Sequence, residues 1–321
     1  MQRQQPSDKR STPSSKRRTR HRDQGVWYPR WFWPSFAAPG MLWLGIFFLL
    51  PFYVVLSIAF GTVDPIFRSA LPVYEPWFWT GSHFSETFAK IFGANAFFQP
   101  AIYRTLIYVF VASLLCIVIG YAVAYYVARF GGRRKTLLLV LLISPFWISY
   151  LMRMLAWVNL LQDQGYVNNI LTTLHLVPHP VPWLEGKAIT VILGLVYGYI
   201  PYMILPLYAF LDRIDQSLLE AGRDLGAGPV QTFLRVTLPL SQPAILAGTV
   251  IVALPMFGDY YTNNLLSNAP TTSMYGNIID DAIGSTGRGP EAAVLVVLLM
   301  VFLVIPMIYY LRSTARTMSA S

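Results

Sequence analysis

Long uncharged apolar blocks dominate the pattern of this chain. Each of six blocks is long enough, or nearly so, for a helix to cross a hydrocarbon core of roughly 30 Å, which takes about 20 residues. None of them alternates polar and apolar positions as a membrane barrel strand would, and an open strand would leave backbone groups unpaired in lipid. The pattern therefore predicts six spanning helices, at 41–60, 105–128, 136–152 with an apolar continuation past Arg153, 188–211, 241–258 and 292–311.

Composition supports an all-α membrane protein. Hydrophobic residues make up 55% of the 321 residues and charged residues 12%, about half the charged share of an ordinary soluble domain. The one cysteine, Cys116, lies in an apolar block. This excludes an intrachain disulfide and a cysteine-based metal site.

The distribution of charge predicts the orientation in the bilayer. If six spans alternate, the side that carries both termini has 18 of the 24 Lys and Arg residues but only 6 of the 15 acidic ones. By the positive-inside rule, both termini are expected to be cytoplasmic. This asymmetry also accounts for the net charge of +9 without any nucleic-acid partner.

The spans divide the chain into three parts. Residues 1–35 are basic and poor in apolar residues, so a disordered cytoplasmic tail beside anionic lipid is expected. Residues 36–313 are expected to form a six-helix transmembrane domain, and 314–321 a short cytoplasmic tail. Arg153 lies about 25 Å along the third span, near its outer boundary, where its side chain is expected to snorkel to water.

The cytoplasmic loop 212–240 has more pattern than a connector needs. Apolar positions between Ile214 and Leu225 predict one short amphipathic helix, and the glycines at 226 and 228 end it. Pro229 suits the first position of a second short helix, which Pro239 is expected to end before the fifth span. Two short helices with apolar sides at a membrane surface indicate a docking partner.

The same loop resembles the E-A-A loop of ABC importer permeases. That family has Glu-Ala-Ala, three residues, Gly, nine residues, Ile, one residue and Leu-Pro. Here Gly222 replaces the third alanine and Val236 the isoleucine, and the spacing is kept throughout. The residues that carry the resemblance are Glu220, Ala221, Gly222, Gly226, Val236, Leu238 and Pro239.

The resemblance implies a type I importer permease in a bacterial inner membrane. In that family the short loop helix docks in a cleft of a cytoplasmic ABC ATPase dimer, so residues 220–239 would couple hydrolysis to transport. A second homologous permease, forming a heterodimer, and an extracytoplasmic binding protein are the other implied partners. The chain has no phosphate-binding Gly-x4-Gly-Lys-Ser/Thr loop, so ATP hydrolysis is expected from a partner chain. As a transport subunit, the chain is expected to be no enzyme and to need no cofactor or metal.

Two stretches, 144–171 and 255–268, resemble the spermidine/putrescine branch of these permeases. The second departs from the branch pattern, because Asn263 replaces a proline, and Ser267 and Asn268 replace two glycines. The resemblance implies a polyamine substrate. Amino acids, metals and other organic cations carried by related permeases remain open alternatives.

Elementary chemistry favours a cationic substrate as well. A carboxylate binds an ammonium group, and a cation over an aromatic ring gains about 0.5–2 kcal/mol. Interfacial anchoring or core packing explains the aromatic residues equally well. Asp280 and Asp281 are expected in a solvated outer loop or against the binding protein. The candidate substrate-path residues are Asp259, Tyr260, Tyr261, Trp147, Tyr150 and Trp157.

Two other classes of membrane protein fit less well. An intramembrane enzyme needs carboxylates or histidines within the spans, and the six blocks contain neither. His175 and His179 have the spacing of metal ligands, but prolines flank His179, which favours a loop. An ion channel would not explain the patterned loop. No catalytic residues are therefore assigned.

Overall fold

The computed structural model describes residues 32–94 and 96–320, in which helices predominate. Most of the expected tail at 1–35 lies outside the described residues, and residues 32–35 belong to the first helix. The last helix continues to Ala320, beyond the expected boundary at 313. The main helices are α1 Phe32–Ala59, α2 Ser82–Phe92, α3 Gln99–Phe130, α4 Lys135–Ile143, α5 Tyr150–Leu161, α6 Tyr166–Thr173, α7 Ala188–Leu211, α8 Gln216–Asp224, α9 Pro229–Thr232, α10 Leu238–Leu240, α11 Gln242–Phe257, α12 Tyr261–Leu266, α13 Tyr275–Gly284 and α14 Gly289–Ala320.

Short elements join these helices. Strands β1 (Thr62–Val63) and β2 (Ala70–Leu71) form an antiparallel hairpin in which Thr62 pairs with Leu71. Three 3-10 turns are η1 Pro76–Phe78, η2 Gly132–Arg134 and η3 Ser144–Trp147. A π-helical turn, η4 (Phe233–Thr237), connects α9 to α10.

Four helical segments in the described chain are long and apolar enough to cross a membrane: Pro34–Ala59, Gln99–Phe130, Ala188–Leu211 and Gly289–Arg312. They match the first, second, fourth and sixth predicted spans. The third and fifth are bent pairs, at 88° between Gly132–Trp147 and Tyr150–Thr173 and at 63° between Pro229–Leu240 and Gln242–Phe257. The described residues thus provide up to six spans if each bent pair counts as one.

The bend in the third span has a local cause. Ile148 and Ser149 adopt extended backbone angles, with ψ of 140° and 141°. Pro145 in the preceding turn lacks the N–H that would continue an α-helix. The apolar block 136–152 therefore contains two helices, and α5 begins only at Tyr150.

The chain divides into two compact units, Met1–Leu50 and Pro51–Ser321. In the described part of the first unit, residues 32–50 are helical, and large apolar side chains such as Leu44 and Phe48 are more than half exposed. A surface of this kind suits contact with lipid or with another membrane subunit rather than with water.

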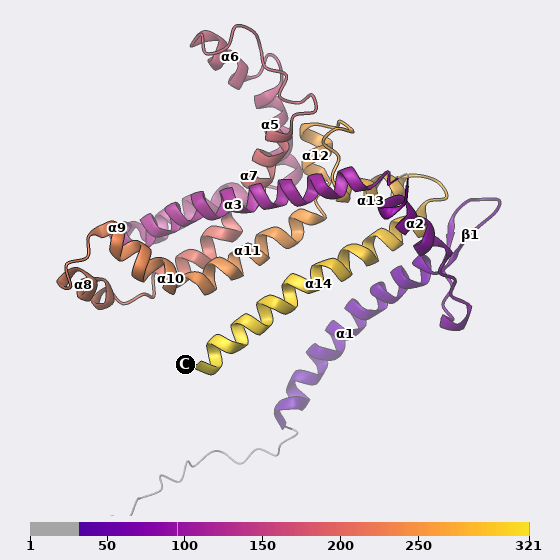
Figure 1. Cartoon of the computed structure of the whole chain (residues 1–321), viewed down its shortest axis with the longest axis horizontal. Helices are drawn as coiled ribbons and strands as arrows, with labels where there is room; N and C mark the ends of the chain where they lie inside the picture. Colours follow the sequence, from indigo (N-terminus) through magenta and orange to yellow (C-terminus); the bar gives the residue numbers. More distant parts are fainter. Residues whose placement is uncertain (1–31, 95, 321) are drawn as a thin grey trace, which may run out of the picture. The chain divides into compact units, whose positions relative to one another are not determined.

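Helices α3, α7 and α11 form the centre of the second unit (Figure 1). Met203 of α7 fills gaps at two glycines of the neighbouring helices. A Cβ at Gly120 of α3 would lie 2.9 Å from its Cγ, and one at Gly248 of α11 would lie 2.6 Å from its Sδ. Small residues thus let the three helices approach closely, as is common in membranes.

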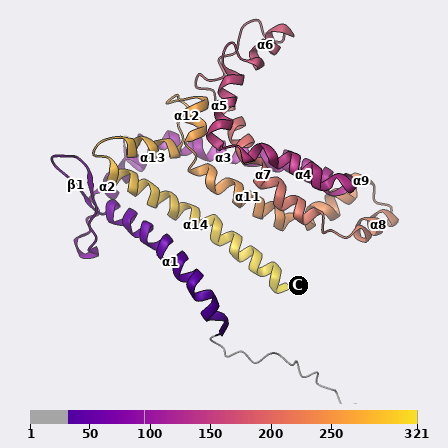
Figure 2. The ribbon, with the colours of Figure 1, turned by 180° about the vertical axis from the view of Figure 1, so that it is seen from behind.

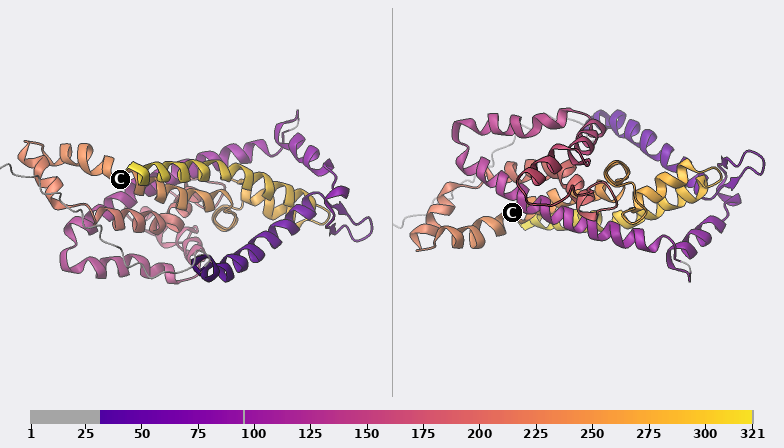
Figure 3. Two further views of the ribbon diagram at one scale, coloured as in Figure 1. Left: turned by 90° about the horizontal axis from the view of Figure 1, so that it is seen from below. Right: turned by 90° about the horizontal axis from the view of Figure 1, so that it is seen from above.

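The two ends of this helix group carry different elements. Helices α8 and α9 lie at one end and α12 and α13 toward the other, as two opposite views show (Figures 1 and 2). Views from below and above also place the orange segment with α8 and α9 at one end (Figure 3). The loop with the E-A-A pattern is therefore well separated from the segment that contains Asp259.

Asn168 fixes the loop that follows α6. Its Nδ2 donates to the carbonyls of Gln162 and Val181, at 3.2 and 3.0 Å, and its Oδ1 accepts from Val181 N and Trp183 Nε1, at 3.0 and 3.1 Å. The side chain is 1% exposed. All its hydrogen-bonding groups are paired, so it holds the loop against α6.

We expect Asn168→Ala to lower the unfolding temperature of the purified protein by several degrees. Each buried group left unpaired costs about 1–3 kcal/mol. Asn169→Ala is the matched control, since that exposed side chain makes a single bond, to the carbonyl of Gln164. Thermal unfolding in detergent checks the prediction, and equal melting of the two variants would contradict it.

Candidate functional site

The carboxylate of Asp259 is the most extensively hydrogen-bonded acidic group near the spans. It follows the end of α11, and the residue is only 7% exposed. The hydroxyls of Tyr150 and Tyr199 donate to Oδ2 at 3.1 and 2.9 Å, and the backbone N–H of Thr262 donates to Oδ1 at 2.9 Å. A buried carboxylate needs such donors to replace water. Its donors come from α5, α7 and α12.

Glycines of α7 make room for this arrangement. A Cβ at Gly198 would lie 2.7 Å from Cε2 of Tyr150, and one at Gly194 would lie 2.7 Å from Cγ2 of Thr262. The hydroxyls of Tyr150 and Thr262 are also hydrogen-bonded to each other. The pair of glycines four residues apart therefore marks the close contact of α7 with α5 and α12.

Arg153 lies near the ring of Tyr150. Its guanidinium carbon is 4.3 Å from the centre of the Phe146 ring, 5.4 Å from that of Tyr150 and 5.8 Å from that of Tyr197. The residue is 8% exposed, so the expectation that its side chain snorkels to water is wrong. Aromatic rings, which attract a cation through their faces, surround it instead.

The other predicted aromatic residues are only partly brought together. Tyr260 and Tyr261 stack on each other with centroids 4.2 Å apart, directly after Asp259. Trp157 meets the ring of Tyr197 edge-on at 5.4 Å. Trp147 is 78% exposed on η3 and does not join the buried group.

Sequence reasoning missed the partners that complete this site. Tyr199 and Thr262 bind the carboxylate, while Phe146 and Tyr197 hold Arg153. The fourth apolar block contains four tyrosines, at 197, 199, 202 and 208. They signalled polar groups along this helix, but the sequence did not show which segments those groups meet.

In loop 212–240, α8 and α9 form two short helices joined by a tight turn. Asp215 caps α8 by accepting a hydrogen bond from Ser217 N at 3.0 Å, and this bond lowers the pKa of its carboxyl. Gly226 has a φ of +81°, which a glycine adopts without strain. Pro229 begins α9 as predicted.

The expected role of Pro239 is wrong, because helical backbone continues through it to Leu240. The preceding π turn gives the reason. Leu238 N donates to the carbonyl of Phe233, five residues earlier. Because the hydrogen-bond pairing is shifted there, a residue without an N–H is tolerated. The chain bends at Ser241 instead, before α11 begins.

Several loop side chains point away from the chain. Glu220, Ala221 and Pro239 are exposed, Gly222 and Leu238 are half-buried, and Leu225 is 89% exposed. A carboxylate beside exposed apolar side chains is the surface that a docking partner would cover.

An aromatic contact anchors this loop to α3. The ring of Phe233 meets Tyr121 and Tyr125 edge-on, with centroids 5.5 and 5.6 Å away. The Tyr121 hydroxyl is hydrogen-bonded to Ser241 Oγ at 2.9 Å, at the bend before α11. The loop is therefore joined firmly to two central helices of the fold.

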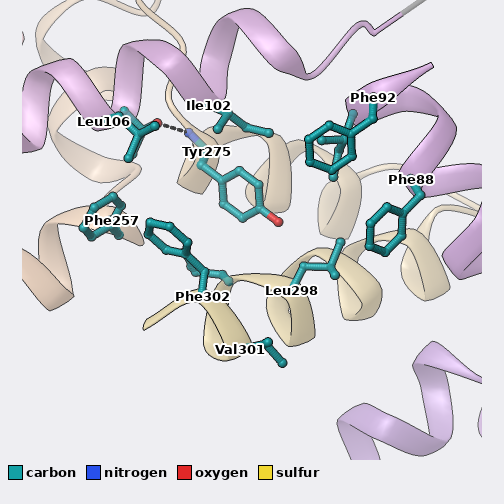
Figure 4. Close-up of a pocket in the computed structure, with 12 residues that line it drawn as sticks. Phe88, Phe92, Ile102, Leu106, Phe257, Tyr275, Leu298, Val301 and Phe302 are labelled. Carbon is teal, nitrogen blue, oxygen red and sulfur yellow. Dashed lines mark hydrogen bonds between the residues drawn. The ribbon is translucent and has the colours of Figure 1, made fainter. Parts of the chain in front are cut away.

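A separate cavity of about 300 Å³ lies between α2, α3, α11, α13 and α14. Its walls include Phe88, Phe92, Phe257 and Phe302, with Tyr275 at the centre of the group (Figure 4). The Tyr275 hydroxyl is already paired with the carbonyl of Leu295 at 2.8 Å. Such a lining suits hydrocarbon and offers nothing to a charged solute.

Comparisons with known proteins agree with this arrangement. Residues 116–317 match the family described as binding-protein-dependent transport system inner membrane component. The chain is 32% identical over 271 residues to the spermidine/putrescine transport system permease protein PotB of Haemophilus influenzae, which covers 84% of this chain and 90% of that protein. It is 31% identical over 268 residues to the inner membrane ABC transporter permease protein YdcU of Escherichia coli, with 79% and 80% covered.

A solved structure shows the same fold. In the crystal structure of a bacterial alginate ABC transporter in complex with alginate pentasaccharide-bound periplasmic protein, one chain superposes with a TM-score of 0.69 and 20% identity, over 89% of this chain and 95% of that one. The predicted permease fold is thereby confirmed. The chain belongs to the family of inner membrane components of binding-protein-dependent transport systems, as a permease subunit of an ABC importer and not an enzyme.

Proposed function

We propose that this permease carries polyamines such as spermidine and putrescine, and that Asp259 binds an ammonium group of the substrate on its way through the membrane. The observation that carries the proposal is the buried Asp259 carboxylate, whose three donors are all neutral. The name of the Haemophilus relative points to the same solutes.

The hydroxyl donors suit a site that exchanges partners. A tyrosine hydroxyl can donate to a carboxylate and, after rotation, accept from an ammonium group. An arriving ammonium would therefore replace the Tyr150 and Tyr199 protons at Asp259 Oδ2 and gain a charge-assisted hydrogen bond, which is about twice as strong as a neutral one. Tyr260 and Tyr261 offer aromatic faces to the rest of the cation.

Coupling to ATP hydrolysis would run from the loop through α11. We infer that α8 and the turn at Gly226 dock on an ABC ATPase dimer, with Glu220 facing the partner. Phe233 and Ser241 transmit the movement to α3 and to α11. Helix α11 is 16 residues long, or about 24 Å at 1.5 Å per residue, and it ends next to Asp259.

The assembly that fits this function has four kinds of subunit. We propose a second, homologous permease beside this chain, an ATPase dimer on the cytoplasmic side and an extracytoplasmic protein that delivers the substrate. Residues 36–313 would form the permease domain, with six spans and loop 212–240 as its coupling segment. Both termini would be cytoplasmic, in keeping with the charge asymmetry.

Single cysteines test the topology. The native Cys116 is fully buried, so it gives little background labelling. In intact cells, Ser82→Cys should react with a membrane-impermeant thiol reagent, because that exposed residue lies in the predicted outer loop. Ser217→Cys, equally exposed but in the coupling loop, should react only after permeabilisation. The reverse pattern would overturn the topology.

Gly226→Val tests the coupling loop. A β-branched side chain at φ of +81° is strained by about 1–3 kcal/mol, so substrate-stimulated ATPase activity and uptake of the assembled complex should both fall about tenfold or more. Gly222→Ala is the control. Its new Cβ would lie 3.5 Å from Thr232 Cγ2, an ordinary contact, and its ATPase should stay normal. Normal stimulation in Gly226→Val would rule out a role for this turn.

Asp259→Asn tests the substrate path. The variant keeps the size of the side chain and removes its charge, and a hydrogen bond to a charged group is worth about 1.5–3 kcal/mol. Spermidine or putrescine uptake at limiting concentration should therefore fall roughly 10- to 100-fold, while basal ATPase activity and assembly persist. Unchanged uptake would remove Asp259 from the path.

A further inference from the structure

Helix α13 is packed directly against the backbone that carries Asp259. A Cβ at Gly276 would lie 2.7 Å from the carbonyl oxygens of both Gly258 and Asp259, so only glycine permits this approach. The adjacent Asn277 donates from Nδ2 to the carbonyl of Tyr260 at 3.2 Å and to Oδ1 of Asn264 at 2.6 Å. The first turn of α13 is thereby fixed to residues 258–264.

This packing brings a second carboxylate to the same place. Asp280 is four residues after Gly276, so it lies on the same face of α13, about 6 Å farther along the helix. Asn264 Nδ2 donates to its Oδ2 at 2.9 Å. Asp280 is half-buried and makes no ion pair with the residues that the structure describes. Its second oxygen is left available to a ligand.

The stacked tyrosines Tyr260 and Tyr261 follow Asp259 in the chain and precede Asn264, the residue that binds Asp280. Tyr261 is 48% exposed and offers a ring face to a ligand. A hydrogen bond with Tyr261, then burial, and then the negative charges of Asp280 and Asp259 raise the pKa of Tyr260 to about 12. The neutral Tyr260 hydroxyl is thus within electrostatic reach of both acidic groups.

We propose that Asp280 is a specificity-determining residue of the substrate path, which binds a second ammonium group of a polyamine whose first ammonium is bound at Asp259. The inference rests on the proposed function. The methylene chain between the two ammonium groups lies over Tyr260 and Tyr261, whose faces attract alkylammonium groups. A substrate with one ammonium reaches only one carboxylate, so the pair selects polyamines over monoamines.

Asp280 and Asp281 offer a matched comparison in the complete complex with its binding protein. Asp280→Asn keeps an acceptor for Asn264, so the fold is retained, and it should reduce spermidine uptake at limiting concentration by about 5- to 50-fold. Asp281→Asn makes the same charge change at an exposed neighbour and should stay within about twofold of the unmodified complex. Asp280→Glu should restore most of the uptake.

The possible outcomes separate this inference from the proposed function. If the unmodified complex transports no polyamine, the proposed function itself fails. If Asp259→Asn is impaired while Asp280→Asn transports normally, the inference about Asp280 alone is overturned. Docking of the binding protein, measured by co-purification with each variant, must remain unchanged. Docking lost in Asp280→Asn would instead assign this carboxylate to the outer interface.

Discussion

A buried carboxylate at the end of an apolar helix is the constraint on which the rest of this structure depends. Asp259 is removed from water, so its oxygens need donors from the protein. Two come from tyrosines on separate helices and one from the N–H of Thr262. Bringing these donors to the carboxylate sets three conditions. Helix α5 must begin where its first residue, Tyr150, reaches α7, and α7 must have no side chain at Gly198. Helix α11 must end before Asp259. Two helix ends and one glycine inside a continuous helix thus serve one charge.

The broken spans are a consequence of this requirement. A continuous third helix would carry Tyr150 onward along the helix axis, whereas the 88° break lets the first residue of α5 contact Gly198 and Tyr199 in the middle of α7. Arg153, one turn after Tyr150 on the same helix, is then enclosed by Phe146 and Tyr197 instead of reaching water. A guanidinium and a carboxylate are therefore both buried against one tyrosine, the first on its ring and the second on its hydroxyl. The two charged groups form no ion pair with each other, so the tyrosine between them and the neighbouring rings provide most of the contacts that replace water around Arg153.

The sequence was informative where a single residue type has a single local consequence. The glycine at 226 predicted a turn and has a positive φ, and Pro229 starts a helix because its missing N–H is harmless there. The sequence was uninformative where the local structure depends on contacts with residues that are distant along the chain. The block 136–152 contains Pro145, which weakens a helix, but it does not show that residues 148 and 149 become extended. The sequence near Pro239 does not reveal the π turn that lets the helix continue. Nor does the sequence show that Tyr199 binds an aspartate 60 positions away.

The same reasoning explains how distant parts of the chain can act on one another. Ser241 is hydrogen-bonded to Tyr121, whose ring meets Phe233 of loop 212–240, and α11 begins at the next residue. At its other end, α11 leads into Gly258 and Asp259, against which Gly276 is packed without space for a methyl group. If loop 212–240 couples hydrolysis to transport as proposed, its displacement would reach Asp259 through α11. The carboxylate would then move relative to Tyr150 and Tyr199, or α13 would move with it, and either change would alter the donors and acceptors that the proposed cationic substrate meets there.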